Sequence, residues 1–492
     1  MLSRDSTHPA WVVCLSLLGV CPARAELLIP GDVRLRHDVQ LLADAGIIDA
    51  PVTGWPVFLA DLNIAANAHE GLDPGATAAL QRVFPAHEVI DRLRLEASAG
   101  GISEPQRFRS FQDTPREQAE LSARLAGTRG RLAFDLTATW VDDPLDQQAW
   151  RADGSYAGFA FGNWFAAISA TDRWWGPGWD GSLALSSSAR PIPAITLQRR
   201  RALRPGSRWL RWVGPWTMQV LSGQLESDRD VPNARLFGWR FGFKPLPRLE
   251  IGLTRTAQWC GDGRPCDFDT FLDLLSGIRD NPQDSATREN DPGNQLAGFD
   301  LRFAFHGLGR PWGFYSQWIG EDEANGLPSA HLAQLGLETW GTRRGGGSYR
   351  VHAEYSETTC SALTDSDPNF RCAYNHTIYT GGYRYRGRAI GHSMDGDGVM
   401  LSVGGLWVGA RGNTWQVLGR RIEVNRSDDP RNTVSPLKQD VYTLEASHTR
   451  DFGFAELTVG LGHEVGEFTQ TGVDFDETRV FANWIWRVSD GY

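Results

Sequence analysis

After residue 25, this chain of 492 residues has no apolar run long enough to cross a bilayer as a helix, because such a helix needs about 20 residues. Lysine is almost missing: Lys244 and Lys438 stand beside 47 arginines among the basic residues. The formal net charge is −10, whereas a nucleic-acid partner calls for a basic surface. The sequence therefore gives no sign of a helical membrane span after residue 25, or of a nucleic-acid partner.

Cysteine is also scarce, with six residues, of which two fall within the first 25. The other four form two close pairs, Cys260 with Cys266 and Cys360 with Cys372. Disulfides persist in oxidising compartments, and four cysteines allow three pairings. We favour the two local pairings. A zinc site is the alternative, although the spacings match no common zinc motif.

The first 25 residues have the pattern of a cleaved signal peptide. Arg4 opens a short polar region, Trp11 to Val20 is apolar, and Ala23 to Ala25 gives a small-x-small cleavage site. Asp5 weakens the positive start, so a buried N-terminal helix is the alternative. Val20 stands before Cys21 where a lipoprotein site needs a small residue. We expect an exported chain that is not lipidated and begins at Glu26.

Residues 26 to about 94 favour helices. In "GDVRLRHDVQLLADAGII" the apolar residues repeat at about 3.6 positions. Asp32 can cap the start of this helix, and Gly46 can lie near its end. "TGWPVFLADLNIAANAHE" and "PGATAALQRVFPAHEVIDRLRLEAS" are two further candidates, the second with Pro74 where a helix can begin. We expect a small periplasmic helical bundle over residues 26–115.

From about Gln118 the apolar period changes to two, which is typical of strands. "RLAFDLTATW" alternates apolar residues with Asp135, Thr137 and Thr139. "LFGWRFGF" does the same around Arg240. Six later stretches repeat the pattern: "LEIGLTRTAQW", "GFDLRFAF", "GFYSQWIG", "SYRVHAEYSE", "TWQVLGRRIE" and "RVFANWIWRV". Residues 116–492 therefore form a mainly β region.

A soluble sandwich and an outer-membrane barrel both produce alternation, but only the barrel carries aromatic girdles at its two membrane interfaces. Aromatic residues recur at the expected strand ends, namely Trp140, Trp259, Trp318, Trp340 and Tyr355. The last residues alternate toward a terminal aromatic, through Val480, Ala482, Trp484, Trp486, Val488 and Tyr492, broken only by Asp490. With roughly 20 residues per strand and connection, the region allows about 16 to 18 strands. We predict an antiparallel outer-membrane β-barrel.

Two long polar stretches, "CGDGRPCDFDTFLDLLSGIRDNPQDSATRENDPGN" and "TTCSALTDSDPNFRCAYN", are the clearest candidates for extracellular loops. Each contains one of the cysteine pairs. A local disulfide restricts the conformations of a loop, so we interpret both pairs as loop cross-links.

One stretch inside the β region, "TDRWWGPGWDGSLALSSSAR", combines three tryptophans with glycine and proline. Flat indole faces beside charged groups suit a sugar, whose C–H face stacks while its hydroxyls form hydrogen bonds. The candidate residues are Asp172, Arg173, Trp174, Trp175, Trp179 and Asp180. An aromatic girdle or a plug packed in the lumen is the alternative for each tryptophan.

An arginine cluster follows directly, and it includes Arg199, Arg200 and Arg201 as polysaccharide-binding candidates, then Arg204, Arg208 and Arg211. These residues could attract an acidic polysaccharide or lipopolysaccharide phosphates, or they could form a solvated turn. Salt should weaken such binding, because exposed charges are screened over about 10 Å in 0.1 M salt.

The stretch "DRWWGPGWDGSLALSSSARPIPAI" resembles the signature of the Wzi-type capsule assembly proteins, and "PGDVRLRHDVQLLADAGIIDAPVTGWPV" at residues 30–57 is similar to the N-terminal helical segment of that family. The resemblance implies an 18-stranded outer-membrane barrel with a periplasmic helical bundle. It also implies a plugged, non-catalytic surface lectin that holds capsular or related exopolysaccharide, without a cofactor. The sugar-binding positions are not fixed by either motif.

Other functions fit less well. Asp142 and Asp143 are adjacent, so on a strand they point to opposite faces and could not flank one glycosidic bond. His352, Glu354 and Ser356 could form a triad, but such elements recur by chance. The histidines His306, His331, His352, His376 and His392 are scattered, and "DGDG" at residues 395–398 fits a turn better than a calcium loop.

A porin is the second alternative, since inward rows such as Arg240, Arg255 and Arg302 could line an anion path or bond to a plugging loop. We expect a monomer in the outer membrane of a Gram-negative cell, in contact with its lipids and lipopolysaccharide. The helical bundle would either bind a periplasmic export partner or close the lower mouth of the barrel.

Overall fold

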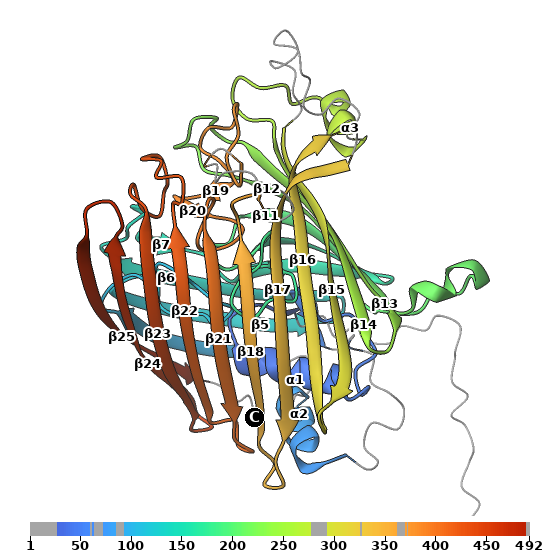
Figure 1. Cartoon of the computed structure of the whole chain (residues 1–492). Helices are drawn as coiled ribbons and strands as arrows, with labels where there is room; N and C mark the ends of the chain where they lie inside the picture. The colour runs from blue at the N-terminus through green and yellow to red at the C-terminus, as the bar shows by residue number, and fades with distance from the viewer. Residues whose placement is uncertain are drawn as a thin grey trace, which may run out of the picture.

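The computed structural model describes residues 27–59, 62, 72–84, 93–276, 293–324, 327–361, 370 and 372–488. The expected signal peptide at residues 1–25, together with Asp490 and Tyr492, lies outside these residues. Figure 1 shows a tall barrel of tilted strands with long loops at its upper end. The predicted fold class is confirmed.

The described strands form one closed antiparallel barrel in which each strand pairs with its neighbours along the chain. β7 and β8 both pair with β6 and count as one interrupted strand, so the described residues give eighteen strands. The strands are β4 Arg94–Ile102, β5 Ala119–Arg129, β6 Leu132–Asp142, β7 Trp150–Arg151, β8 Ser155–Phe161, β9 Trp164–Ala170, β11 Ala194–Arg199, β12 Trp216–Gln224, β13 Arg235–Leu246, β14 Leu249–Trp259, β15 Asn294–Gly307, β16 Arg310–Ala324, β17 Leu327–Thr342, β18 Ser348–Glu357, β21 Val399–Val408, β22 Thr414–Val424, β23 Gln439–Asp451, β24 Ala455–Phe468 and β25 Val473–Arg487.

The barrel closes where β25 pairs with β4, with Trp484 opposite Ala99. The first barrel strand therefore begins at Arg94, and the predicted boundary at residue 116 is wrong by a whole strand. β4 reads "RLEASAGGI", and its Ala, Ser and Gly residues carry too little apolar contrast to show a period of two. Its backbone is held in the sheet by hydrogen bonds to both neighbours.

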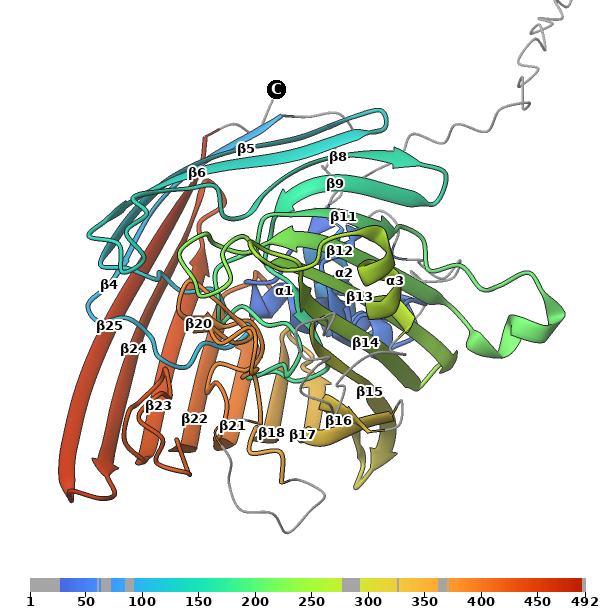
Figure 2. The same ribbon diagram turned by 90° about the horizontal axis from the view of Figure 1, so that it is seen from above.

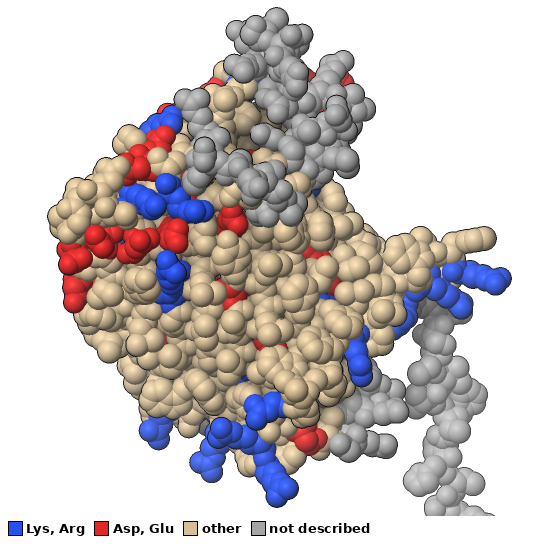
Figure 3. Space-filling model, viewed as in Figure 1, with Lys and Arg blue, Asp and Glu red and all other residues tan. Residues whose placement is uncertain are grey.

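The alternation within the strands separates a lipid-facing surface from a polar interior. On β6, Leu132 and Leu136 are 54% and 49% exposed on the outer face, while Asp135 is 3% exposed inside. Such an apolar outer face is typical of a membrane barrel. In Figure 3 the middle and lower wall of the barrel carries few charged residues, and basic side chains gather at its lower rim.

The two ends of the barrel differ in the length of their connections. The turns 247–248 and 308–309 are short, while the connections after β14 and β18 are long and contain the two cysteine pairs. Periplasmic turns are short and extracellular loops long, so the end that carries α3 (Phe268–Ser276) in Figure 1 is extracellular. Both predicted disulfides, Cys260–Cys266 and Cys360–Cys372, are present; α3 itself was not predicted.

Two helices lie within the ring of strands seen from above in Figure 2. α1 (Val33–Asp44) has Asp32 as its N-cap, which accepts the N–H of Leu35 at 3.0 Å. α2 (Pro74–Val83) begins at the predicted proline. Arg82 on α2 donates two hydrogen bonds of 2.7 Å to Asp38 on α1, so the helices are tied together. No described helix has the length and apolar character that a membrane span requires.

The helix predicted to begin at a Thr-Gly-Trp-Pro turn, residues 53–56, is wrong at its start. Gly54–Trp55 forms β2, which pairs with β10 (Trp174–Trp175), and Val57–Phe58 forms β3, which pairs with β1 (Leu27–Leu28). These pairings with distant segments override the local pattern. The rest of that candidate and the end of the third, over residues 60–61, 63–71 and 85–92, lie outside the described residues.

Trp340 was expected in an aromatic girdle, but it does not belong to one. It is 5% exposed and faces inward, with the guanidinium groups of Arg302 and Arg350 at 5.1 and 4.8 Å from its ring. It packs in the same apolar cluster as Trp174 and Val39. A tryptophan near a strand end can thus face either the lipid or the lumen. For Trp340 the lumen side follows from its two-residue spacing from the inward Glu338.

Candidate functional site

The tryptophan-rich segment 172–190 enters the lumen between β9 and β11 and forms part of a plug. Its first tryptophans make up β10, in which Trp174 lies opposite Trp55 and Trp175 opposite Gly54. The two sequence motifs that resemble one family, about 115 residues apart, are therefore hydrogen-bonded to each other. We use "plug" for residues 27–59, 72–84, 103–118 and 171–193 together.

The three tryptophans are buried: Trp174 and Trp175 are 0% exposed and Trp179 is 5% exposed. Trp174 donates its indole N–H to the backbone oxygen of Gly178 at 3.0 Å, and Trp175 donates to Gln219 at 2.8 Å. Trp179 donates to Glu338 on the barrel wall at 2.7 Å. Satisfied N–H groups and missing exposure favour packing over stacking with a sugar, although sugar binding by these residues stays a prediction.

The segment needs glycine at positions 178 and 181 because neighbouring atoms lie too close to the backbone for a side chain, not because the backbone adopts a conformation that only glycine allows. A side-chain carbon on Gly181 would lie 2.1 Å from Nε2 of His392, and one on Gly178 would lie 2.3 Å from the backbone oxygen of Gly181. Neither space accepts a methyl group. The segment thus combines large indole rings with glycines because the backbone must turn tightly inside a filled lumen.

Inward carboxylates of the wall hold the segment in place. Glu354 on β18 accepts the backbone N–H groups of Trp179 at 2.8 Å and Gly181 at 2.9 Å. Arg420 on β22 forms a bidentate pair with Asp180, with contacts of 2.8 to 3.0 Å, and both side chains are at most 1% exposed. Charge-assisted bonds of this kind are the strong ones in proteins. They fix the plug against the wall.

The residues considered as a catalytic triad have the same structural role. Glu354 bonds the plug as described, and the ring of His352 stacks on Trp179 with centroids 6.1 Å apart. Ser356 accepts from Gln334 at 3.1 Å, and Gln334 in turn donates to the backbone oxygen of Gly181 at 3.0 Å. The geometry supports anchoring of the plug by these side chains.

The structure separates the predicted arginine cluster from the tryptophans. Arg199 ends β11 at the periplasmic side, where its guanidinium lies 3.6 Å from the ring centroid of Trp216. Arg200 is 7% exposed, and Arg201 begins an exposed connection held by Asn163 at 2.7 Å. Arg173 stays inside, where it donates to Ser169 at 2.8 Å. The nine candidates therefore do not form one binding surface.

A polar cavity of about 230 Å³ lies between the plug and the wall formed by β25, β4, β5 and β6. It is smaller than the roughly 300–1,000 Å³ of sites for drug-sized ligands, so it suits a single sugar ring better than a length of chain. Of the nine predicted candidates, only Asp172 lines it. Its charged lining residues are Glu96, Asp113, Glu120, Asp153 and Asp172 with Arg116, Arg124 and Arg151.

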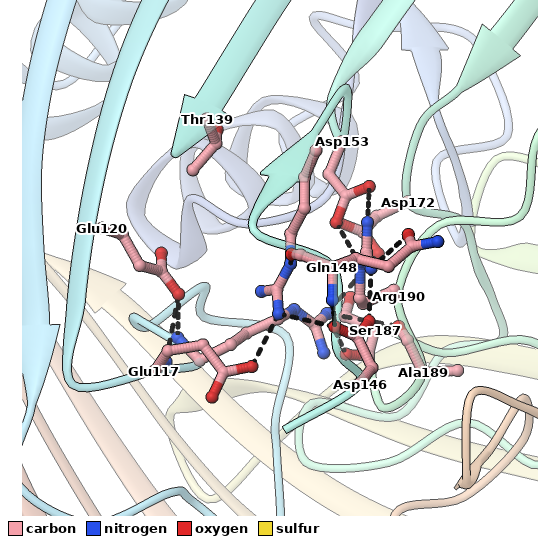
Figure 4. Close-up of polar contacts among 12 residues, drawn as sticks. Glu117, Glu120, Thr139, Asp146, Gln148, Asp153, Asp172, Ser187, Ala189 and Arg190 are labelled. Carbon is pink, nitrogen blue, oxygen red and sulfur yellow. Dashed lines mark hydrogen bonds and ion pairs between the residues drawn. The ribbon is translucent and has the colours of Figure 1, made fainter. Parts of the chain in front are cut away.

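The floor of this cavity is held by a network that Figure 4 shows from the side of the wall strands. Arg116 donates to the backbone oxygens of Ser187 at 3.0 Å and Ser188 at 3.1 Å. Arg190 donates twice to Asp153, at 2.7 and 2.9 Å. Arg116 thus donates to carbonyl oxygens of the plug, and Arg190 ties the plug to Asp153, which lines the cavity.

Asp172 lines the cavity and changes its protonation state near neutral pH. Burial raises the pKa of Asp172 from 3.8 to about 7, and the negative charges of Asp113 and Asp153 add to this, while Arg116 opposes it from 4.0 Å. About a fifth of the side chain stays exposed to the cavity. The folded protein therefore keeps a proton there that the unfolded chain releases, between about pH 4 and 7.

We expect Asp172→Asn to remove this dependence. The native state binds more protons than the unfolded state, so the stability that the wild type has below pH 4 is lost as pH rises through 7. The variant should match the wild type at pH 4 and exceed it at pH 8 by on the order of 4 kcal/mol, since the shift from 3.8 to about 7 spans about three pKa units of about 1.4 kcal/mol each. Heat-unfolding midpoints of the purified barrel at both pH values test this; a constant difference between the proteins would contradict it.

Sequence reasoning missed the other residues of the cavity. Glu120 accepts the backbone N–H groups of Arg116 and Glu117 at 2.7 and 3.0 Å, and Ser122 bonds to Thr139 at 2.8 Å. They come from separate strands and from loops far apart in the sequence. The one available signal was the alternation along β5 and β6, which predicts which side chains face the lumen but not which of them surround a cavity.

Some functional hypotheses receive no geometric support. Among the described residues, no group of three or more His, Cys, Asp or Glu side chains could hold a metal ion. In the "DGDG" stretch, Asp395 and Asp397 have φ of 60° and 63°, and Asp395 binds Arg384 at 2.6 Å, as in a turn. Of the arginines expected to face inward, Arg240 binds Asp300 and Arg302 binds Asp44 of α1 at 2.6 Å. Arg255 instead shares the outward face of β14 with Leu253.

Comparison with known proteins places the chain among relatives of this architecture. Residues 91–478 match the family described as capsule assembly protein Wzi. An uncharacterized 55.8 kDa protein in the cps region of Klebsiella pneumoniae is 32% identical over 339 residues, which is 66% of this chain and 64% of that protein. The chain is also similar to a solved structure, that of Wzi from Escherichia coli, with 25% sequence identity. That protein is described as an outer-membrane carbohydrate-binding β-barrel involved in group 1 capsule assembly. Its TM-score is 0.82 over 94% of this chain and 100% of that chain. The chain therefore belongs to the Wzi family of capsule assembly proteins.

Proposed function

We propose that this protein is an outer-membrane lectin that attaches capsular or related exopolysaccharide to the cell surface without catalysing a reaction. The observation that carries the proposal is membership of the capsule assembly family over most of the chain. The carbohydrate binding described for the Escherichia coli relative, which shares the whole barrel, supports it.

The filled lumen favours binding over conduction. Arg240, which could have lined an anion path, donates to Thr53 of the plug at 3.0 Å and to Asp300 at 2.9 Å. Arg302 donates to Asp44 of α1 at 2.6 Å. These bonds between wall and plug supply the ordinary partners of lumen charges, so Arg240 and Arg302 do not support the porin alternative.

We propose the polar cavity as the place where one sugar ring of the polymer is held. Its acidic lining offers hydrogen-bond acceptors to hydroxyl groups, and Arg116 in that lining is held by carbonyl oxygens of the plug. Carboxylates accept such bonds well because they are charged acceptors. The cavity reaches Glu120 and Asp153 near the extracellular ends of β5 and β7, which is the side where the polymer lies.

Polysaccharide retention tests both parts of the proposal. The gene is deleted and complemented with the wild type, with Ser98→Phe or with Ala99→Phe, and polymer is measured in the cell-bound and medium fractions. Ser98 lines the cavity on β4, so a phenylalanine there fills it. Ala99 is the next residue, opposite the 53% exposed Leu121 on the outer face, and it serves as the matched control.

We expect deletion to leave total polymer unchanged and to move it into the medium, with Ser98→Phe behaving like the deletion and Ala99→Phe like the wild type. If deletion does not change the distribution, the lectin function is wrong. If deletion releases polymer but Ser98→Phe retains it, the function holds and the cavity is not the sugar site.

A further inference from the structure

The connection between β11 and β12, residues 200–215, is unusual for its position. β11 runs down to Arg199 and β12 runs up from Trp216, so the connection belongs to the periplasmic side, where turns such as 247–248 are short. Figures 1 and 2 both show this green segment projecting sideways, beyond the ring of strands. It therefore extends in the plane of the membrane rather than down into the periplasm. We call it the finger.

The finger presents large apolar side chains to the outside. It contains the 3-10 helix Arg208–Val213, in which Trp209 is 86% exposed, Trp212 63% and Leu210 50%. Three neighbouring apolar side chains at such exposure need an apolar or interfacial environment. Tryptophan in particular gathers at membrane–water interfaces, where its ring lies at the level of the lipid head groups.

The helical turn also contacts the outer wall of the barrel through Trp212. Trp212 meets Phe243 of β13 edge-on, with ring centroids 6.1 Å apart, and Phe243 shares its outward face with Phe241. Phe241 in turn contacts Trp216 at 5.5 Å. The apolar surface of the finger is thus continuous with the lipid-facing surface of the barrel.

The finger is also strongly basic. It carries five arginines and no acidic residue, and no acidic residue occurs anywhere from 181 to 225. Arg204 pairs with Asp49 beside α1 at 3.2 Å, while Arg208 and Arg211 are exposed within the helical turn. Figure 3 shows these basic side chains along the lateral projection. A basic, tryptophan-bearing helical turn matches a bilayer surface with phosphate groups.

We infer that the finger is an interfacial anchor on the periplasmic leaflet of the outer membrane. Trp209, Leu210 and Trp212 enter the boundary between head groups and acyl chains, and Arg208 and Arg211 bind phospholipid phosphates. The periplasmic position selects phospholipid, because lipopolysaccharide, which the sequence suggested for this cluster, faces the extracellular side. The inference does not depend on polysaccharide binding.

Site-directed labelling tests the anchor in the intact barrel. Trp209→Cys is labelled with an environment-sensitive dye and reconstituted in vesicles of phosphatidylcholine, with or without phosphatidylglycerol. The four described cysteines are in disulfides, so the new thiol can be labelled selectively. Leu444→Cys, on the outer face of β23 and 58% exposed, is the lipid control. Arg344→Cys, in the exposed periplasmic turn between β17 and β18, is the aqueous control.

We expect the dye at position 209 to emit at short wavelength and to resist iodide quenching, as at position 444. In vesicles with phosphatidylglycerol, Arg208→Gln and Arg211→Gln should each weaken this protection about fivefold, in line with one basic residue near an anionic surface. Quenching as strong as at position 344 would overturn the anchor. Protection that the glutamine variants leave unchanged would overturn the phosphate contacts, and protection that requires a second protein would make the finger a protein-docking segment instead.

Discussion

Replacing Arg420 with methionine is expected to lower the free energy of unfolding by about 3–5 kcal/mol, because it leaves a buried carboxylate without its partner. Asp180 is 1% exposed in its side chain and faces Arg420 at 2.8 Å, deep between plug and wall. Glu445 would lose its contact with Arg420 as well, although Arg479 stays 3.4 Å away. The plug should therefore loosen before the barrel unfolds.

Heat unfolding of the purified protein, followed by the shift of the folded band in denaturing gels, measures this loss. Arg421→Met is the matched control, since Arg421 is the next residue, its side chain is 57% exposed, and it pairs with Glu423 at 3.5 Å. Exposed pairs contribute about 0–1 kcal/mol. The double variant Arg420→Met with Asp180→Asn removes the stranded charge, so it should recover much of the stability. A loss as small as that of Arg421→Met would contradict the anchoring role of the pair.

Trp175→Ala is expected to have an effect of similar size, about 3–5 kcal/mol, because it opens a cavity in the packed centre of the plug. Trp175 is 0% exposed, and its loss also leaves Gln219 without the indole donor at 2.8 Å. Trp209→Ala, at an 86% exposed position, should change the stability of the detergent-solubilised protein by less than about 0.5 kcal/mol.

This comparison also distinguishes the two interpretations of the tryptophan-rich segment. If the rings pack the plug, polymer retention and the unfolding midpoint should fall together in Trp175→Ala, and Trp175→Phe should restore much of both. A variant that keeps the wild-type midpoint but releases the polymer would show that the ring contacts sugar, and the packing interpretation would then be wrong.

The barrel was predictable wherever the two faces of a strand meet different solvents. In β6 and β13 the period of two follows directly, since lipid selects apolar side chains and the lumen tolerates Asp135 and Arg240. The same logic failed for β4, where both faces carry small residues, and for Trp340, whose ring is apolar but packs inside. The local sequence predicts a strand when its two faces differ in polarity. It does not predict one when that difference is small, and it does not tell on which side an aromatic ring lies.

The site was harder to predict than the fold. The tryptophan-rich segment stood out as a motif, yet nothing local says that Gly181 lies against His392, or that Trp174 pairs with Trp55. The cavity lining comes from separate strands and loops, of which Asp172 alone was singled out. Contacts across such sequence distances depend on how the plug folds back into the lumen.

The sequence by itself determined the strand-rich region, the N-cap of α1, the start of α2 at Pro74, the two disulfides and the family resemblance. Each of these depends on neighbouring residues or on a short spacing, so the information is local. The tertiary structure decided that the tryptophans are buried, that wall carboxylates hold the plug, and that the arginine cluster projects on the periplasmic side. These outcomes depend on which distant segments meet inside a closed barrel, because closure fixes the direction of every strand and connection at once.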